Sequence, residues 1–373
     1  KNSLELYLHI PFCIKKCDYC DFLSGPSTRA GQEAYIYALL REMQAVSLLE
    51  KRSVDTVFIG GGTPSVPECD VMEKLLQGIR ESFCLEPDAE VTIEANPGTL
   101  TLEKLALYRK YGINRISLGL QSPNDEELAM LGRIHNYAQF LESYEMARKA
   151  GFSNINVDLM FAIPGQSYEG WMKNLRTVAE LGPEHISAYS LIIEDGTPFA
   201  KRELELPDED TEYRMYEDVA EVLGEYGYQQ YEISNYAKKG RECRHNEGYW
   251  KRRDYLGLGL GAASLLGKER FTNTMDMQEY INNSSFPEKI RKDRELLTRK
   301  DEMAEFMFLG LRMTRGVSKT EFQEYFGTGI EKIYGEILEK YKKQGMLVEL
   351  EDRIFLSRAG IHVSNAVMAD FLL

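Results

Sequence analysis

Near its start the chain reads Tyr-Leu-His-Ile-Pro-Phe-Cys-Ile-Lys-Lys-Cys-Asp-Tyr-Cys at residues 7–20. The apolar run Leu4–Ile10 that leads into this segment predicts a buried strand, and the loop behind it carries Cys13, Cys17 and Cys20. The chain has 373 residues and only 6 cysteines, so it is too large and too poor in cysteine to be a disulfide-stapled secreted scaffold. Three closely spaced cysteines instead indicate a site for a metal ion or a cluster.

The Cys-x3-Cys-x2-Cys spacing fits two kinds of metal centre. Three thiolates on one tight loop can hold three irons of a [4Fe-4S] cluster, which ordinarily takes four cysteines, so the fourth iron would be open for a ligand. A structural zinc site with His9 as its fourth ligand is the alternative, although zinc sites more often use two separated Cys-x2-Cys pairs. Cys69 and Cys84 lack such spacing and are interpreted as small structural residues.

β-rich runs alternate with amphipathic stretches over the first half of the chain. The runs are Leu4–Ile10, Val54–Ile59, Val91–Glu94, Arg115–Leu118, Ile155–Leu159 and His185–Leu191, and the first helical pattern extends from Gln32 to Leu49. Repeated β/α units imply a parallel sheet, and six of them with short loops favour a partial barrel over a doubly wound sheet. We therefore expect an α/β fold in which residues 1–200 form a partial (β/α)6 TIM-like barrel that carries the cysteine loop.

The rhythm changes after residue 200 and predicts two further units. Residues 201–284 form an extension that begins with a predicted helix, Asp208–Tyr226. From about residue 285 the chain is predicted to be helical up to residue 373, with a helix Ile330–Gln344, a hairpin across Glu351-Asp352 and a last helix from Ser357. This order resembles a winged-helix module, but the lysines of its second helix are offset by glutamates, so we expect no binding of nucleic acid.

The charge balance and the hydropathy exclude several classes of protein. Asp and Glu number 59 against 45 Lys and Arg, which gives a net charge of -14 and argues against broad contact with phosphate backbones or anionic lipid. The most apolar stretch, Leu256–Leu266, is rich in glycine and far shorter than the roughly 20 residues that span a bilayer. We recognise no signal peptide before the cysteines. We therefore expect a cytoplasmic protein without a transmembrane segment.

Polar or glycine residues end several of the predicted strands. Because the carboxyl ends of the strands form the active face of β/α folds, these residues should converge on one ligand; they are Gly61, Gly62, Glu94, Gln121 and Asp158. Consecutive glycines allow a small polar ligand to approach the backbone closely, although Gly60–Gly62 is equally compatible with a tight turn. The carboxylates suit an amino group and ribose hydroxyls, and Arg133 suits a carboxylate, with a surface salt bridge as its alternative.

Short motifs spread over nearly the whole chain form a recognisable set. They are Tyr7-Leu-His-Ile-Pro-Phe-Cys, Gly60-Gly-Gly-Thr-Pro, Glu94-Ala-Asn-Pro, Leu118-Gly-Leu-Gln-Ser, Leu131-Gly-Arg-Ile-His135, Asp158-Leu-Met and Pro164-Gly-Gln. This set resembles radical S-adenosylmethionine (SAM) enzymes of the coproporphyrinogen oxidase group and, within that group, the HemW-type heme chaperones. The resemblance implies a radical SAM barrel.

The resemblance also implies roles for individual residues. Cys13, Cys17 and Cys20 would hold a [4Fe-4S] cluster whose open iron chelates the amino and carboxylate groups of SAM. The positions that match SAM contacts in the family are Tyr7, Gly61, Gly62, Thr63, Glu94, Gln121, Arg133 and Asp158, with Tyr19 and Ile192 as weaker matches. In radical SAM enzymes generally, one electron from the cluster cleaves the SAM sulfonium to a 5′-deoxyadenosyl radical.

Two features separate the oxidases from the chaperones. The oxidases resemble Cys-x3-Cys-x2-Cys-x-Cys and carry extra N-terminal sequence, whereas this chain has Phe22 at the fourth cysteine position and 12 residues before Cys13. Further along, Arg244-His-Asn-Glu-Gly-Tyr-Trp250 looks like the His-Asn-x-x-Tyr-Trp signature of the chaperones. Both features weigh against an oxidase.

The chemistry of the signature fits heme. His245 can offer a neutral imidazole to heme iron, and Tyr249 and Trp250 can stack on the porphyrin or line its rim; a hydrogen-bonded loop histidine is the alternative for His245. Cys243, two residues before His245, is interpreted as an ordinary small residue, with a thiolate ligand or a point of covalent attachment as the alternatives.

The neighbouring segments 257–261 and 261–264 each resemble a known sequence pattern only in part. Where the chaperones usually read Gly-Ala-His-Ser, this chain reads Gly261-Ala-Ala-Ser264, so Ala263 replaces a histidine, which would weaken heme handling if that histidine contacts heme or SAM. The neighbouring run Gly257–Gly261 matches part of a dinucleotide-binding fingerprint but lacks the strand–helix context that this fingerprint needs.

The resemblance therefore implies a protein that binds a [4Fe-4S] cluster, SAM and heme, and delivers heme to apo-hemoproteins without oxidising coproporphyrinogen. The alternative is oxygen-independent coproporphyrinogen III dehydrogenation, or another radical conversion of a porphyrin-like substrate. A winged-helix regulator that uses the cluster as a sensor is a third hypothesis. Because family members can dimerise, a homodimer is a further expectation.

Overall fold

The computed structural model describes residues 3–372 and is built on one twelve-stranded sheet. Its centre consists of parallel neighbours in chain order, namely β1 (Leu4–Ile10), β2 (Val54–Gly61), β3 (Leu85–Ala95), β4 (Arg115–Gln121), β5 (Ile155–Phe161) and β6 (His185–Ser190). These strands match the six predicted runs, and the α/β partial barrel is confirmed. Parallel strands that are buried on both faces need such continuous apolar runs.

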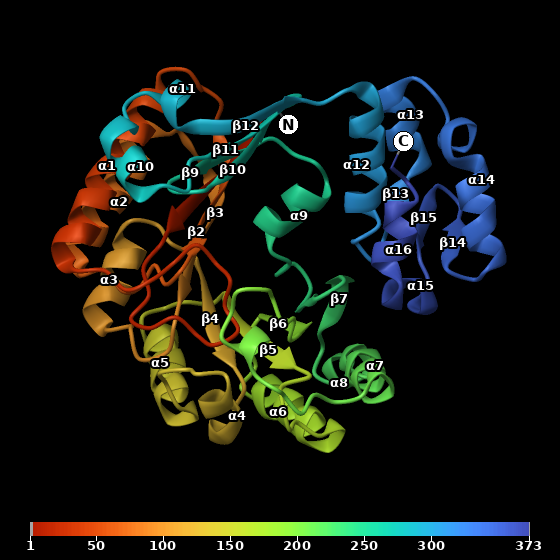
Figure 1. The fold of residues 1–373 in the computed structure, drawn as a ribbon, viewed down its shortest axis with the longest axis horizontal. Coiled ribbons are helices and arrows are strands. Elements are labelled where there is room, and N and C mark those ends of the chain that lie inside the picture. Colours follow the sequence, from red (N-terminus) through yellow and green to blue (C-terminus); the bar gives the residue numbers. More distant parts are fainter. Residues whose placement is uncertain (1–2, 373) are drawn as a thin grey trace.

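Helices cover the outer side of this curved sheet (Figure 1). They are α1 (Arg29–Ser47), α2 (Cys69–Ser82), α3 (Leu102–Lys110), α4 (Asp125–Met130), α5 (Tyr137–Lys149) and α6 (Tyr168–Glu180). In α2 the apolar residues recur with helical spacing and are buried, for example Met72, Leu75 and Ile79. Burying such a side chain completely contributes about 1.5–3 kcal/mol, so this face fixes the helix against the barrel.

Residues beyond 200 extend the same sheet at both edges. β9 (Tyr255–Leu258) pairs in parallel with β1, and β10 (Ala263–Leu266), β11 (Glu269–Asn273) and β12 (Arg291–Leu296) follow it in antiparallel order. The other edge carries β8 (Asn235–Ala237) and β7 (Gln229–Glu232). The prediction of helix from about residue 285 was therefore wrong for residues 291–296, because this polar segment pairs with β11 and needs no apolar pattern of its own.

The structure differs from the prediction for one helix of the extension and explains its glycine-rich run. The predicted helix Asp208–Tyr226 is broken at Asp218 into α7 (Glu209–Glu217) and α8 (Val219–Gly224). The glycine-rich run begins inside strand β9, where a Cβ on Gly257 would lie 2.2 Å from the carbonyl oxygen of Ala263. Close approach of two backbones, and not a nucleotide loop, explains that glycine. Two short helices, α10 (Met277–Asn283) and α11 (Pro287–Ile290), pack on α1.

The C-terminal part has its own small core. It contains α12 (Arg299–Gly310), β13 (Val317–Ser318), α13 (Lys319–Phe326), α14 (Ile330–Lys343), β14 (Leu347–Leu350), β15 (Arg353–Leu356), α15 (Arg358–His362) and α16 (Ser364–Ala369). The hairpin across Glu351-Asp352 is present as predicted. A separate apolar cluster holds these elements together. The division of the chain at residues 200 and 284 stays a prediction.

The interior of the barrel is polar over much of its depth. Arg115, Ser117, Gly119 and Gln121 alternate along β4 and line cavities inside the barrel, whereas the interior of TIM barrels is usually filled with apolar branched side chains. Helix α9 (Arg244–Trp250) stands in the gap of the incomplete barrel, between the sheet and the C-terminal helices (Figure 1). Within residues 3–372, no helix is both long and apolar enough to cross a membrane.

Candidate functional site

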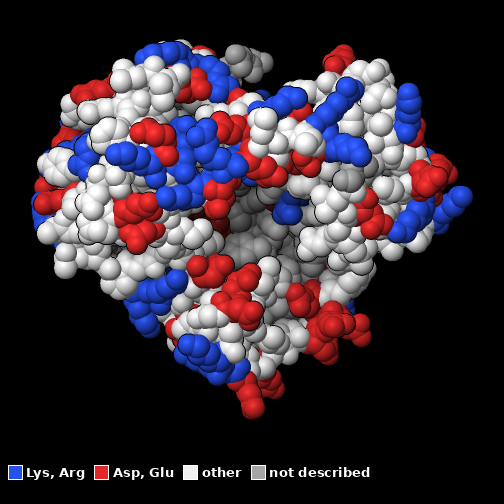
Figure 2. All heavy atoms as spheres, turned by 45° about the horizontal axis from the view of Figure 1, so that its top comes forward, with Lys and Arg blue, Asp and Glu red and all other residues white. Residues whose placement is uncertain are grey.

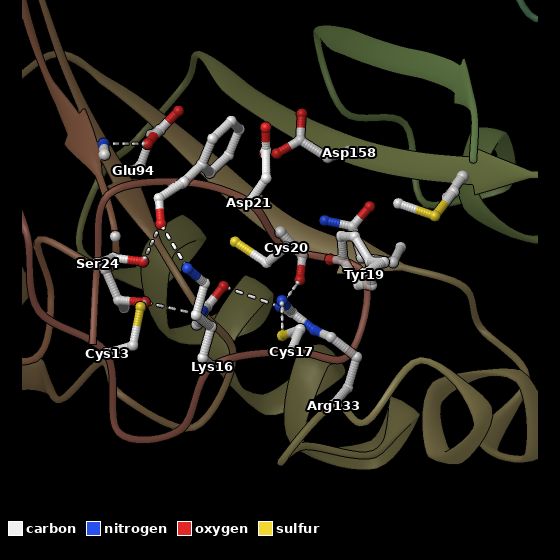
Figure 3. A pocket seen from close by; sticks show the side chains of 18 of the residues that line it. Cys13, Lys16, Cys17, Tyr19, Cys20, Asp21, Ser24, Glu94, Arg133 and Asp158 are labelled. Carbon is white, nitrogen blue, oxygen red and sulfur yellow. Dashed lines mark hydrogen bonds between the residues drawn. The ribbon is translucent and has the colours of Figure 1, made fainter. Parts of the chain in front are cut away.

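A cavity of about 410 Å³, here called the upper cavity, opens at the carboxyl ends of the barrel strands. It collects nearly all the residues expected to bind the cluster and SAM: Cys13, Cys17, Tyr19, Cys20, Gly61, Gly62, Thr63, Glu94, Gln121, Arg133, Asp158 and Ile192. Figure 3 shows the three cysteines on one loop that faces Glu94, Asp158 and Arg133. The predicted convergence of strand ends is therefore present, with Tyr7 as the exception.

The cysteine loop is held against the end of β2 by backbone contacts. Its first cysteine donates its N–H to the carbonyl of Gly25 (3.0 Å), and Thr63 donates its N–H to the carbonyl of Phe12 (2.6 Å). A Cβ on Gly62 would lie 2.7 Å from that same carbonyl oxygen, and Gly61 has a φ of +113° with its Cα beside the ring of His9. The glycines thus form a tight turn, and their lack of a Cβ also lets the backbone of the cysteine loop lie close to the end of β2.

The three cysteines fit a cluster better than a single metal ion. All three are free thiols and partly exposed, and donors point at two of the sulfurs: Thr63 Oγ1 lies 3.7 Å from Cys13 Sγ, and Arg133 Nη1 lies 3.4 Å from Cys17 Sγ. Hydrogen bonds to sulfur are one means by which proteins tune iron–sulfur clusters. No three of the His, Cys, Asp and Glu side chains in residues 3–372 converge as ligands of one ion, whereas a [4Fe-4S] cluster needs its three thiolates on three different irons.

His9 is not placed to complete a zinc site. Its Nε2 lies 2.8 Å from the carbonyl oxygen of Leu23, and its Nδ1 lies 3.0 Å from the hydroxyl of Tyr7. Both ring nitrogens therefore have protein partners, and burial lowers the pKa of the ring. The histidine holds the base of the cysteine loop, and the zinc alternative loses its fourth ligand.

Arg133 is aimed at the cysteine loop and is not a surface salt bridge. Its guanidinium donates to Asn96 Oδ1 (2.8 Å), to the carbonyl of Gly119 and to Cys17 Sγ, while its buried Nε has no partner. Asn96 in turn donates to Thr63 Oγ1 (2.8 Å). Asn96 was not predicted from the sequence, although it lies in the quoted Glu94-Ala-Asn-Pro motif and falls on the same face as Glu94, two residues away.

Gln121 is held by a second residue that the sequence analysis missed. The hydroxyl of Tyr189 donates to Gln121 Oε1 (2.7 Å), and Gln121 itself has a φ of +74°. Tyr189 lies on β6 at an inward-facing position, so strand alternation was the signal that pointed to it. The hydrogen bond fixes the amide at the cavity wall in a backbone conformation that is uncommon for a residue other than glycine.

The acids of the cavity are buried and easily protonated. Burial, reinforced by the charge of Asp158, raises the pKa of Glu94 to about 8, although the N–H of Gly61 donates to Glu94 Oε2 (3.0 Å). Burial also raises the pKa of Asp158, against hydrogen bonds from Asn156, Ser187 and Ser117. A bound ammonium group would reverse this effect, because an opposite charge favours the ionised carboxylate. Both acids are therefore suited to a cationic ligand.

A second cavity of about 240 Å³, here called the lower chamber, lies deeper in the barrel. Tyr7 lies here, and helix α9 closes the chamber with His245, Asn246 and Tyr249. The remaining wall consists of Phe58, Glu94, Arg115, Ser117, Asn156, Asp158 and Ser187. Because Glu94, Ser117 and Asp158 also line the upper cavity, the two spaces are neighbours that share a polar wall.

His245 is buried on a helix and is not a loop residue. Only 1% of it is exposed, and both ring nitrogens are engaged: Nδ1 lies 2.7 Å from Thr56 Oγ1 and Nε2 lies 2.9 Å from the hydroxyl of Tyr249. The ring also stacks on Phe58 at 5.3 Å between centroids. Burial, with the charge of Arg115, lowers the pKa of His245 to about 3, so the imidazole is neutral.

Trp250 faces a different space from His245. It lines a largely apolar groove of about 360 Å³ with Phe308, Leu309, Arg312, Asn365, Met368, Ala369 and Leu372, and the guanidinium of Arg312 lies 4.3 Å from its ring centroid. Successive helical residues point about 100° apart, which is why Tyr249 and Trp250 separate. The structure thus places Tyr249 beside His245 and Trp250 in a separate groove.

Cys243, Phe22 and Ala263 also have definite environments. Burial raises the pKa of Cys243 to about 12, and its Sγ donates to Glu90 Oε1 (3.6 Å), so it is an ordinary buried thiol and not a thiolate ligand. Phe22 is 63% exposed and lines the upper cavity where the oxidase pattern has a cysteine. Ala263 is exposed at the start of β10.

Comparison with known proteins agrees with this geometry. Residues 7–178 match the Radical SAM superfamily, and residues 297–363 match the HemN C-terminal domain. A protein named heme chaperone HemW from Lactococcus lactis subsp. lactis (strain IL1403) is 39% identical over 371 residues, which cover 98% of this chain and 97% of that protein. The protein of the same name from Escherichia coli (strain K12) is 37% identical, with 99% of this chain and 98% of that protein covered.

A solved structure shows the same fold. Coproporphyrinogen III oxidase (HemN) from Escherichia coli, a radical SAM enzyme, superposes with a TM-score of 0.89 over 100% of this chain and 90% of that chain, at 24% identity. This likeness supports the fold, including the C-terminal domain. Because the full-length sequence similarity lies with the chaperones, the chain belongs to the HemW family within the radical SAM superfamily.

Proposed function

We propose that this protein is a heme chaperone that binds a [4Fe-4S] cluster and SAM, takes up heme and transfers it to apo-hemoproteins. The observation that carries the proposal is the full-length similarity, at 33–39% identity, to relatives named heme chaperone HemW. The likeness to the oxidase structure, at 24% identity, shows the fold alone. The exposed Phe22 supports the same choice, because the oxidase pattern has a cysteine at that position.

The residues of the upper cavity suit the cluster and SAM. We assign the cluster to Cys13, Cys17 and Cys20, and a bound cluster of this kind supplies an electron to SAM in radical SAM enzymes. A cationic ligand would favour the ionised forms of Glu94 and Asp158, whose pKa values burial raises. For SAM we also assign Tyr19, Gly61, Gly62, Thr63, Gln121, Arg133 and Ile192, and we assign Tyr7 only as a support through His9 and the shared wall.

Heme binding by His245 requires a local rearrangement. Its Nε2 can reach an iron only if the hydroxyl of Tyr249 gives up its 2.9 Å hydrogen bond and helix α9 moves away from the chamber. The low pKa of the buried ring keeps the nitrogen lone pair free of a proton. We therefore propose His245 as the iron ligand of an opened α9, with Trp250 and Arg312 beside the macrocycle.

The groove at Trp250 offers a second possible position for heme, which can be tested separately from His245. It combines an apolar floor with Arg312, which is able to pair with a propionate, and with Met368, whose thioether is a known type of heme ligand. If heme binds in this groove without opening α9, Met368 and not His245 will control the spectrum. Titration of the cluster-loaded protein with heme, followed at the Soret band, separates the two arrangements.

The variants for this titration are His245→Ala, Met368→Ala and the control His362→Ala, whose ring stacks on Tyr213 at the far side of α7. We expect H245A to weaken heme binding and to change the Soret maximum, while H362A binds as the wild type does. Transfer is measured by adding an apo-hemoprotein and following its holo spectrum. Absence of heme uptake by the wild type would overturn the chaperone proposal.

Product analysis addresses the enzymatic alternative. The cluster-loaded protein is incubated anaerobically with coproporphyrinogen III, SAM and a reductant, and we expect no protoporphyrinogen. Its formation would show an oxygen-independent dehydrogenase. The same sample with and without heme reports whether any SAM cleavage depends on heme.

The partners and the compartment belong to the same proposal. The net charge of -14 does not favour nucleic acid, although Figure 2 shows Lys and Arg side chains above the hollow as well as acidic side chains below it. A gel shift at low salt is expected to show no DNA binding. Free thiols that hold an oxygen-sensitive cluster suit the reducing cytoplasm, and a homodimer stays a prediction for the cluster-loaded, SAM-bound protein.

A further inference from the structure

The lower chamber contains a buried cation that the proposed function does not use. Arg115 is the first residue of β4 and points into the barrel, with only 2% of its surface exposed. Its Nε is a buried donor without a hydrogen-bond partner, and it forms no ion pair within residues 3–372. Proteins rarely leave a buried guanidinium in this state, because a buried charged donor without a partner costs more than an unsatisfied neutral one.

The acids around Arg115 do not provide this missing partner. Glu90 faces it but is already engaged by helix α9, since it accepts the N–H groups of Arg244 and His245 (both 3.3 Å) and the thiol of Cys243. Asp158 accepts from Asn156 Nδ2 at 2.7 Å. Burial alone lowers the pKa of Arg115, but nearby acidic groups, Glu90 and Asp158 among them, outweigh it and raise that pKa, so the guanidinium stays positive.

Other polar groups border the same space. Asn246 lines the chamber from α9, directly after His245 in the chaperone signature. Unlike His245, whose ring is fixed by Thr56 and Tyr249, the amide of Asn246 is available to a ligand. Asn156 is not available, because it bridges Ser117, Asp158, His185 and Ser187. The chamber thus presents one guanidinium and one amide around a volume of about 240 Å³.

We propose that the lower chamber is a binding site for a small monocarboxylate, which pairs with Arg115 and accepts a hydrogen bond from Asn246. A carboxylate matches the planar fork of a guanidinium and can bind it with two parallel hydrogen bonds. A single negative charge suits a guanidinium that has acids nearby but an unpartnered donor, whereas a multiply charged phosphate would be repelled more strongly by Glu90 and Asp158. The volume allows a short carbon chain and excludes a porphyrin.

The ligand enters from the upper cavity. Glu94, Ser117 and Asp158 line both spaces, and α9 closes the opposite side, where a Cβ on Gly248 would already lie 1.8 Å from Glu5 Oε1. A carboxylate in the chamber would therefore contact α9 through Asn246, in the same helix that holds the proposed heme ligand. This site is distinct from the positions assigned to SAM, because Arg115 does not line the upper cavity.

Saturation-transfer NMR with acetate tests the site on the cluster-loaded, SAM-free protein, with sodium chloride holding the ionic strength constant. We expect acetate and propionate to bind the wild type, and Arg115→Gln to weaken binding by roughly 10- to 100-fold, as for loss of a charged hydrogen-bond partner. Asn246→Ala should weaken it less. The matched control Arg148→Gln removes another partly buried arginine, paired with Glu184 at 2.8 Å on α5, and should bind acetate as the wild type does.

Further arms keep the proposal falsifiable if R115Q does not fold. Arg115→Lys retains the charge but loses the planar fork, so it should fold and still bind acetate more weakly. The proposal is overturned if the wild type binds no acetate, or if binding is kept in R115K and N246A but lost in Arg133→Lys, which would place the carboxylate in the upper cavity.

Discussion

The upper cavity and the lower chamber are built from the same strands but behave differently. In the upper cavity, loops bring partly exposed side chains such as Cys13 and Cys17 to an opening, and Arg133 and Thr63 donate to their sulfurs. In the lower chamber, α9 closes the barrel and His245 is tied to Thr56 and Tyr249. The upper cavity thus opens at the strand ends, while the lower chamber is a polar space inside the barrel that one helix walls on one side and that borders the upper cavity on another.

The largest effect is expected at the cysteine loop. Cys17→Ala removes one of three cluster ligands, so we expect loss of essentially all cluster iron and of the associated absorbance, because two thiolates hold a [4Fe-4S] cluster poorly. The control is Cys84→Ala. Cys84 is an exposed thiol between α2 and β3 and does not line the upper cavity. Iron retention in C17A would show that the upper cavity is not the cluster site.

The closed chamber is probed by adding one methyl group to α9. Gly248→Ala places a Cβ within about 2 Å of the Glu5 carboxylate, so α9 must move, and we expect the free energy of unfolding to fall by roughly 1–3 kcal/mol. The control Gly335→Ala lies within α14 with no atom near its would-be Cβ and should be neutral or stabilising by up to about 1 kcal/mol. Urea denaturation measures both. Equal effects would mean that α9 does not close the barrel.

The third prediction separates the two spaces by their ligands. Arg133→Lys keeps the charge but cannot donate to Cys17, Asn96 and Gly119 together, so we expect SAM affinity to fall by roughly tenfold, about 1.4 kcal/mol. His245→Ala lies in the lower chamber and should leave SAM affinity nearly unchanged. Equilibrium binding of SAM to the cluster-loaded protein measures this difference. A larger loss in H245A than in R133K would contradict the separation.

The last prediction concerns the pH dependence of the shared wall. The pKa of Glu94 is raised to about 8 by burial, so the folded protein binds this proton more tightly than the unfolded chain does. The contribution of Glu94 to the free energy of unfolding is therefore complete below pH 4.5 and is lost as the pH rises toward 8. The free energy falls by at most about 1.4 kcal/mol per pH unit in this range. Glu94→Gln should flatten that fall in thermal unfolding, and the exposed control Glu145→Gln should not. An unchanged slope in E94Q would show that Glu94 is already ionised.

The six central strands of the barrel were predicted correctly from the sequence, because each is a short run rich in buried apolar residues. The sequence also predicted the residues of the upper cavity, since the carboxyl ends of parallel strands meet at one edge. Asn96 and Tyr189 were missed, although strand alternation pointed to both. Strand β12 was missed because its polar residues carry no pattern, and its position depends on pairing with β11.

The sequence by itself determined the cysteine loop, the glycines beside it and the family, because these features depend on residue type and local spacing. Only the tertiary structure decided where the side chains of the His-Asn-x-x-Tyr-Trp segment lie. Residues that are adjacent in sequence point in different directions on a helix, so His245 and Asn246 close the lower chamber while Trp250 faces the C-terminal helices. Likewise, no local pattern shows that Arg115 lacks a partner, since that depends on which distant side chains have already been satisfied by others.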